Sequence, residues 1–214
     1  MMTTEGIVKV IDQESWDRAE RFRFFNKMDY PQFNICANLD IAKFLPSIKA
    51  QQLSFYGAMI FAAARALNQI PAFRYRIRGD QVVLHEQVHP SFTSLPPGSE
   101  LFKIVTVELE DSLAAFAAKA KQQAAAQECF ISPAAMARDD LIYITCIPWV
   151  SFTHISHPID LTPGDSAPRV SWGKFFAAEE KIWLPFSVQA HHALVDGIHI
   201  GQYITELQTY LDTI

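Results

Sequence analysis

The sequence predicts an α+β fold in two layers, with helices covering a mixed, mostly antiparallel sheet. Apolar and polar residues alternate in several short stretches, which is typical of strands with one buried face. Between these stretches lie Ala-rich or amphipathic segments that are long enough for helices. The chain has 214 residues, of which 50% are hydrophobic and 19% charged. This composition supports a sizeable core, so we expect one domain over residues 1–214.

The N-terminal half predicts two helices, a strand and a hairpin. Asp12 and Ser15 are suitable caps for a short helix that carries Trp16, Arg18 and Phe22. Alternation over 33–41 predicts a strand, and the Ala-rich stretch 55–70 predicts a buried helix that Pro71 ends. The segments 73–78 and 81–88 alternate around Gly79-Asp80 and predict a hairpin.

The C-terminal half predicts further strands and two helices. We expect strands within 101–109, 141–147, 168–176 and 181–190, the last two joined by a polar turn, and a helix over 113–128 capped at Asp111-Ser112. In the last segment, 198–211, one helical stripe is apolar: Ile200, Tyr203, Ile204, Leu207 and Leu211.

Charge and cysteine content exclude several classes of function. The net charge is −5 and the basic residues form no run, so neither nucleic acid nor an anionic membrane is an expected partner. Cys36, Cys129 and Cys146 form no close pair, which indicates reduced thiols in the cytoplasm. No stretch has the length and apolarity of a signal peptide or a membrane span, so we expect a soluble cytoplasmic protein.

The stretch QAHHALVDGIHI, residues 189–200, is the strongest candidate for a chemical site. It places His191, His192, Asp196 and Gly197 where a strand ends and a helix begins, a rigid junction on both sides. Neutral imidazole is a common base for a hydroxyl proton near pH 7. These residues alone leave open a purely structural strand end. The chain is rich in histidine but has no HExxH or Cys/His ligand spacing, so we expect no metal.

HHALVDG resembles the HHxxxDG motif of chloramphenicol acetyltransferases, dihydrolipoamide acyltransferase catalytic domains and peptide-synthetase condensation domains. Three further segments select among them: WDRAERFRFF near the start, PWVSF at 148–152, and LPFSVQAHHALVDGIH before the last helix. In order and spacing they are similar to the chloramphenicol acetyltransferase family over essentially the whole chain.

The resemblance implies a general base and a supporting ion pair. His192, the second His of the motif, would take the acceptor's hydroxyl proton as its oxygen attacks acetyl-CoA, with both substrates bound together. Asp196 would pair with Arg18 to fix the loop that bears His192. Thr145 stands where the family has an oxyanion-stabilising Ser, and its hydroxyl can donate the same bond.

The resemblance also assigns binding residues. Lys174, Phe175 and Tyr56 match residues of the family's coenzyme A channel. Ser171, which we group with them, stands where the family has a Thr that binds an active-site water. Ser54 stands where a second Lys is common. For the acceptor it implies Phe25, Thr93, Phe102, Phe130, Phe152, Ile155 and His157. Phe25 replaces a Tyr, and His157 occupies a position that is usually apolar.

The implied function is acetyl-CoA-dependent 3-O-acetylation of chloramphenicol by a homotrimer with its sites between subunits. One alternative is a related acyltransferase for another alcohol or an amine. A dihydrolipoamide acyltransferase core fits less well, because lipoyl and linker segments are missing. A non-catalytic trimeric binding module is the third, and the presence of His192, Asp196 and Arg18 argues against it.

Overall fold

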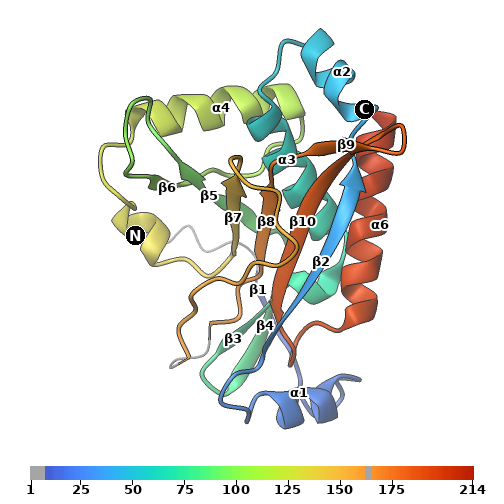
Figure 1. Cartoon of the computed structure of the whole chain (residues 1–214). Coiled ribbons are helices and arrows are strands. Elements are labelled where there is room, and N and C mark those ends of the chain that lie inside the picture. The colour runs from blue at the N-terminus through green and yellow to red at the C-terminus, as the bar shows by residue number, and fades with distance from the viewer. Residues whose placement is uncertain (1–7, 162–164) are drawn as a thin grey trace.

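The computed structural model describes residues 8–161 and 165–214, and a mixed sheet of seven strands is its central element (Figure 1). The strand order is β2-β10-β8-β7-β5-β6, with β9 paired to β10. These strands are β2 (Gln32–Asp40), β5 (His89–Ser94), β6 (Lys103–Thr106), β7 (Leu141–Ile147), β8 (Arg169–Gly173), β9 (Phe176–Ala178) and β10 (Lys181–His191). The pairs β5·β7 and β7·β8 are parallel, and the others are antiparallel. The predicted α+β class is therefore confirmed.

The two faces of the sheet differ in chemistry, as strand alternation requires. Ile144, Val170 and Val188 lie side by side on adjacent strands and belong to the apolar core. On the opposite face the same register brings Thr145, Ser171 and Ser187 together. One face is thus available for a hydrophobic core and the other for polar chemistry.

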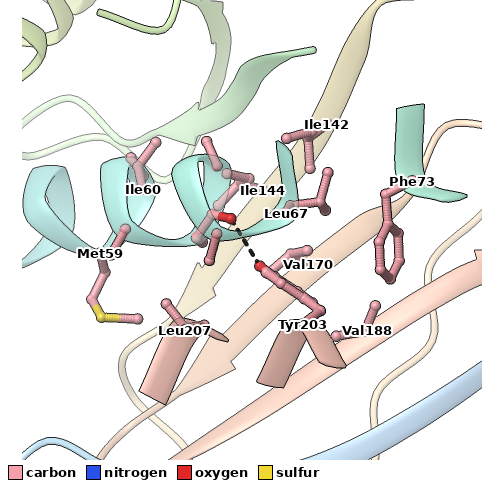
Figure 2. Close-up of a cluster of buried hydrophobic side chains, with 14 of the residues drawn as sticks. Met59, Ile60, Leu67, Phe73, Ile142, Ile144, Val170, Val188, Tyr203 and Leu207 are labelled. Atoms are coloured by element: carbon pink, nitrogen blue, oxygen red, sulfur yellow. Dashed lines mark hydrogen bonds between the residues drawn. The ribbon is translucent and has the colours of Figure 1, made fainter. Parts of the chain in front are cut away.

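The helices are α1 (Ala19–Phe25), α2 (Phe44–Ala50), α3 (Phe55–Asn68), α4 (Leu113–Ala126), α5 (Pro133–Met136) and α6 (Gly197–Thr213), with a 3₁₀ turn at Pro71–Arg74. Of these, α3 and α6 pack directly on the strands, and α2 and α4 pack against α3. The buried hydroxyl of Tyr203 on α6 donates to the Ala63 carbonyl on α3 at 3.1 Å, which ties the two helices together inside the core (Figure 2). A three-stranded sheet, β1 (Val8–Val10), β4 (Gln81–His85) and β3 (Tyr75–Arg78), adjoins them.

Most predicted elements are confirmed, but the predicted start of the first helix is wrong, and the strand expected within 168–176 is divided into β8 and β9. Ser54 and Ser112 cap α3 and α4 by accepting from the backbone three residues later. In contrast, Asp12 and Ser15 do not cap α1: the Ser15 hydroxyl donates to the Asp12 carboxylate at 2.7 Å, and the helix begins only at Ala19. Local side-chain bonding in a turn competes with helix capping, and here the turn is favoured.

After β7 the chain crosses the polar face of the sheet and passes in front of β8 and β10 (Figure 1). We call residues 148–157 of this stretch the crossing segment. Its backbone is tied to the strands beneath. The Val150 carbonyl accepts from the Lys174 N–H at 2.9 Å, and the Gln189 side chain accepts from the His157 N–H at 2.8 Å. Gly173, at the end of β8, permits this close approach because it has no side chain.

We predict that Gly173→Ala destabilises the protein by about 1–3 kcal/mol through overpacking. An added Cβ would lie 2.7 Å from the Val150 carbonyl oxygen and 3.0 Å from the Phe152 ring. Urea unfolding at a fixed protein concentration measures the change. The matched control is Gly201→Ala in α6, where, apart from the neighbouring helix backbone, no heavy atom of the described residues lies within 4 Å of the new Cβ. There we expect a gain of about 0.5–1 kcal/mol from helix propensity. Equal stabilities for the two variants would contradict the packing argument.

Candidate active site

His192 follows the last residue of β10, at the corner from which α6 begins. Its side chain is 34% exposed. Nδ1 lies 3.1 Å from the Val195 carbonyl oxygen and 3.3 Å from Asp196 Oδ1. A carbonyl oxygen can only accept a hydrogen bond, so Nδ1 carries the proton in the neutral ring. The lone pair is then on Nε2, which is the arrangement that a general base requires.

Two aromatic rings fix the plane of the imidazole. Phe25, from the end of α1, stacks on it with ring centroids 3.9 Å apart and planes within 11°. Phe33, on β2, lies 4.5 Å away at 33°. Antiparallel pairing of β2 with β10 brings Phe33 to this corner. The stack limits rotation of the ring and keeps Nε2 at a constant position.

His191, its neighbour, is only 2% exposed and has a different role. Its Nδ1 accepts from the Ala193 N–H at 3.2 Å. Burial lowers the pKa of His191 to about 4, so the ring is neutral at physiological pH. It supports the corner and does not face solvent.

The Arg18 guanidinium, 11% exposed, clamps the turn that bears His192. It forms a bidentate ion pair with Asp196, in which the second contact, to Oδ1, is 2.7 Å. It also donates to the His192 carbonyl at 2.8 Å and to the Ala193 carbonyl at 2.7 Å. The fork geometry of arginine suits several acceptors at once, and lysine could not replace it.

Asp196 joins this clamp to the start of α6. Its N–H donates to the His199 Nδ1 at 2.9 Å, one turn into the helix. The Arg18 guanidinium holds the pKa of Asp196 below its usual value, so the carboxylate is charged at neutral pH. The expected pairing of Arg18 with Asp196 is thus present, and it fixes the turn at both ends.

A second site feature is a cleft of about 1300 Å³ that runs between α3, the loop after β5, and strands β7 and β8. Seven residues that the sequence assigns to coenzyme or acceptor binding or to catalysis line it: Tyr56, Thr93, Phe102, Thr145, His157, Lys174 and Phe175. Its lining is mostly apolar with a few polar groups, as in many small-molecule sites.

Thr145 lies on the floor of this cleft. It is the register partner of Ser171 on the parallel strand β8, so the two hydroxyls share one face. Ser171 is 1% exposed, and its Oγ lies 2.6 Å from the His157 Nε2. The resemblance implies that the Ser171 hydroxyl binds a water molecule, but here it contacts the His157 imidazole.

Of the four residues grouped for coenzyme A, Tyr56, Lys174 and Phe175 line the cleft and Ser171 does not. Lys174 and Phe175 follow β8, and the Phe175 ring packs edge-on against Phe55 at the start of α3. Tyr56 donates its hydroxyl to the Thr93 carbonyl, and burial raises the pKa of Tyr56, so the phenol stays neutral. A cation beside aromatic walls suits a phosphate-bearing adenine nucleotide with an extended arm.

The remaining acceptor candidates, Phe25, Phe130, Phe152 and Ile155, do not line the cleft. Phe130 packs on Phe102 with centroids 5.7 Å apart, and both rings are largely exposed. Phe152 lies above Gly173 in the crossing segment. Ile155 accepts from the Asn34 amide through its carbonyl. Phe25 is in the His192 stack, away from this group.

Within one chain, His192 and Thr145 cannot act on the same atom. The register aligns Thr145, Ser171 and Ser187 across three strands. His192 lies five residues beyond Ser187, so strand geometry separates it from that row by about 15 Å along β10. Figure 1 shows α1 and the start of α6 at the lower end of β10, opposite the start of α3. His192 does not line the cleft. The His192 corner and the Thr145 cleft are therefore separate within one chain, and we refer to them as the two half-sites.

Two partners of His192 were not among the expected site residues. In the sequence, Phe33 is only one apolar position of a predicted strand. Its contact with His192 follows from the pairing of β2 with β10, which the sequence does not reveal. The Val195 carbonyl belongs to the backbone and has no sequence signal.

Among residues 8–161 and 165–214, no group of three His, Cys, Asp or Glu side chains could hold a metal ion. Within the same ranges, no helix is long and apolar enough to cross a bilayer.

Comparisons with known sequences identify the family. The family model described as chloramphenicol acetyltransferase matches residues 7–208. A chloramphenicol acetyltransferase from Klebsiella sp is 30% identical over 204 residues, which cover 94% of this chain and 93% of that protein. One from Bacillus pumilus is 29% identical over 206 residues, which cover 95% of this chain and 93% of that protein.

Solved structures agree. A chloramphenicol acetyltransferase superposes with a TM-score of 0.88 at 26% identity, covering 96% of this chain and all of that chain. The dihydrolipoamide acetyltransferase of Azotobacter vinelandii shares the fold, with a TM-score of 0.71 at 18% identity and coverage of 91% and 86%. With the motif corner, the clamp and the cleft already described, these matches show that the chain belongs to the chloramphenicol acetyltransferase family.

Proposed function

We propose that residues 1–214 form one acyltransferase domain that transfers the acetyl group of acetyl-CoA to the primary hydroxyl of chloramphenicol. The observation that carries the proposal is the state of His192: Nδ1 is bonded to the Val195 carbonyl, so Nε2 is the free base. Free-thiol release from acetyl-CoA, with chloramphenicol as acceptor, tests it directly.

His192 would act first. Bound acetyl-CoA supplies an electrophilic thioester carbonyl. Nε2 accepts the proton of the acceptor hydroxyl as a C–O bond forms at that carbonyl. When the C–S bond breaks, the same nitrogen returns the proton to the departing thiolate, so atoms and charges balance. Because both substrates are held together, positioning contributes much of the rate, and the protein itself is not acetylated.

Thr145 would stabilise the negative charge that develops on the carbonyl oxygen. Its hydroxyl can donate one hydrogen bond from the floor of the cleft. The extra methyl of Thr, compared with the usual Ser, limits its rotamers and so holds the hydroxyl in fewer orientations.

The complete site would form between subunits of a homotrimer. His192 follows the end of β10, whereas Thr145 aligns with Ser187 near the middle of that strand, so one chain would supply the base and its neighbour the cleft. Exposed apolar side chains lie near both half-sites: Phe24, Met28, Tyr30 and Ile198 near His192, and Trp149 and Val150 beside the cleft. Such patches are typical of subunit interfaces.

A different alcohol or an amine remains the second candidate acceptor. Phe25 has no hydroxyl to offer, and it is stacked on the catalytic ring. His157 adds a polar group to the cleft. Parallel assays with simple alcohols and amines separate the two candidates, since thiol release with those acceptors alone would keep the chemistry and reject chloramphenicol.

We predict that His192→Ala lowers kcat by about 10²–10⁴-fold, the usual contribution of a general base. The KM for acetyl-CoA should change little, because the residue lies outside the coenzyme end of the cleft. The matched control is His154→Ala, a change of the same kind at an exposed position. Turnover of His192→Ala close to that of the control would rule out the mechanism.

We predict that Asp196→Asn lowers stability by about 1–2 kcal/mol at pH 7, since it removes the charge paired with Arg18. The carboxyl's pKa is depressed below 3.8 in the folded protein, so its contribution is present above that pH and is lost on acidification. The difference between wild type and variant in urea unfolding should therefore shrink toward pH 3. Asp17→Asn, exposed on the same segment as Arg18, is the control. If the difference in unfolding free energy between wild type and Asp196→Asn stayed constant with pH, the stabilising role of the charged Asp196 would be contradicted.

We predict intersubunit complementation between His192→Ala and Thr145→Val, a variant that keeps the shape of Thr without its hydroxyl. Each variant alone should be nearly inactive. Unfolded together and refolded as a random equimolar mixture, a cyclic trimer regains about a quarter of wild-type activity, because one interface in four combines both intact residues. If a single chain supplied both residues, mixing would restore nothing. Thr145→Ser should stay active and serves as the control.

A further inference from the structure

The wall of the cleft has apolar and polar parts. Near the loop after β5 and on β6, its lining includes the apolar side chains of Leu95, Phe102 and Ile104, with Ser99 and Glu100 beside them. Along the starts of β7 and β8 it is polar, with Tyr143, His157 and Arg169. Arg169 is paired with Asp165, and its guanidinium also lies over the Tyr143 ring at 5.2 Å, so it is already occupied. His157 is a polar group of this wall that has capacity for a further partner.

His157 is held in place on three sides. Its N–H donates to the Gln189 side-chain oxygen at 2.8 Å, and the Gln189 amide returns a longer bond to the His157 carbonyl. Its Nε2 lies 2.6 Å from the buried Ser171 hydroxyl. Gln189 and Ser171 are each 1% exposed and belong to the rigid sheet. The ring therefore has a fixed orientation on the wall of the cleft.

The other ring nitrogen, Nδ1, has no hydrogen bond to any residue within 8–161 and 165–214, and it is not sealed off from solvent. Burial, with the nearby Arg169 charge, lowers the pKa of His157, so the ring is neutral at physiological pH. Neutral imidazole with Nε2 engaged still offers one polar atom at Nδ1, as donor or acceptor according to the tautomer.

We propose that His157 is a specificity-determining residue of the acceptor cleft: with Nε2 anchored on Ser171, its Nδ1 binds a second hydrogen-bonding group of the acceptor. This inference rests on the proposed acetyl transfer. It names the acceptor class as an alcohol that carries another polar substituent, with a hydroxyl the best match because it can donate or accept. An acceptor without such a group leaves Nδ1 desolvated and unpaired, and is bound less well.

The test compares chloramphenicol with three analogues that each lack one polar group besides the primary hydroxyl. These are the analogue without the secondary hydroxyl, the one with an N-methylated amide and the one without the nitro group. The measured quantity is the ratio of kcat/KM for chloramphenicol to kcat/KM for each analogue. In the wild type, at least one ratio should be about ten, the usual effect of one net hydrogen bond.

Three variants of His157 distinguish the contribution of Nδ1 to the selectivity from that of Nε2. His157→Leu removes both, so the selective ratio should fall from about ten to about one. His157→Asn places an amide near the Nδ1 position and should retain most of the discrimination. His157→Gln reaches the Nε2 position, so it keeps the Ser171 contact but should lose the discrimination. His154→Leu, exposed in the same segment, is the matched control and should keep the wild-type ratios.

Unchanged ratios in His157→Leu for all three analogues would overturn the proposal. The proposal would also be overturned if His157→Gln kept the selective kcat/KM ratio and His157→Asn lost it, because His157 would then only position Ser171. Thermal unfolding of each variant checks the fold, and His157→Asn provides the test if the Leu variant does not fold. Absence of thiol release from the wild type with every acceptor is a different result, which refutes the acetyl transfer itself.

Discussion

The Arg18 guanidinium lies where three segments meet: the start of α1, the turn after β10 and the start of α6. It binds the carboxylate of Asp196 and the carbonyls of His192 and Ala193, so one planar group holds both the backbone of His192 and the turn that follows it. The clamp also sets the place of α1, whose last residue, Phe25, stacks on the imidazole. Ring orientation therefore depends on the clamp even though Arg18 does not touch the ring.

The division into two half-sites follows from strand geometry. A base at the end of β10 and a hydroxyl in the middle of β7 lie on the same sheet, but too far apart to meet. A rigid sheet cannot bend to close that distance, because its core side is packed throughout. In the proposed assembly, a second copy presents its cleft to His192 of the first copy. Catalysis would then require that assembly.

The elements that are predicted correctly depend on local chemistry. The strand-to-helix corner at His192, the cap at Ser112 and the hairpin at Gly79 all involve residues close in the chain. The prediction failed at α1, because the Ser15 hydroxyl bonds to Asp12 and forms a turn in place of a cap. It could not find Phe33 beside His192, or the contact of His157 with Ser171, because both depend on strand register and on the path of the crossing segment.

The polar face of the sheet explains how this hydrophobic chain can keep a chemically competent cleft. The Ser187 hydroxyl donates to the Asn34 side-chain oxygen at 2.9 Å, the Asn34 amide donates to the Ile155 carbonyl, and Gln189 holds the backbone of His157. Each group satisfies another, so burial leaves no unpaired polar atom among them and the network is rigid. The crossing segment is thereby fixed over the sheet, and the groups that line the cleft need little reorganisation when an acceptor binds.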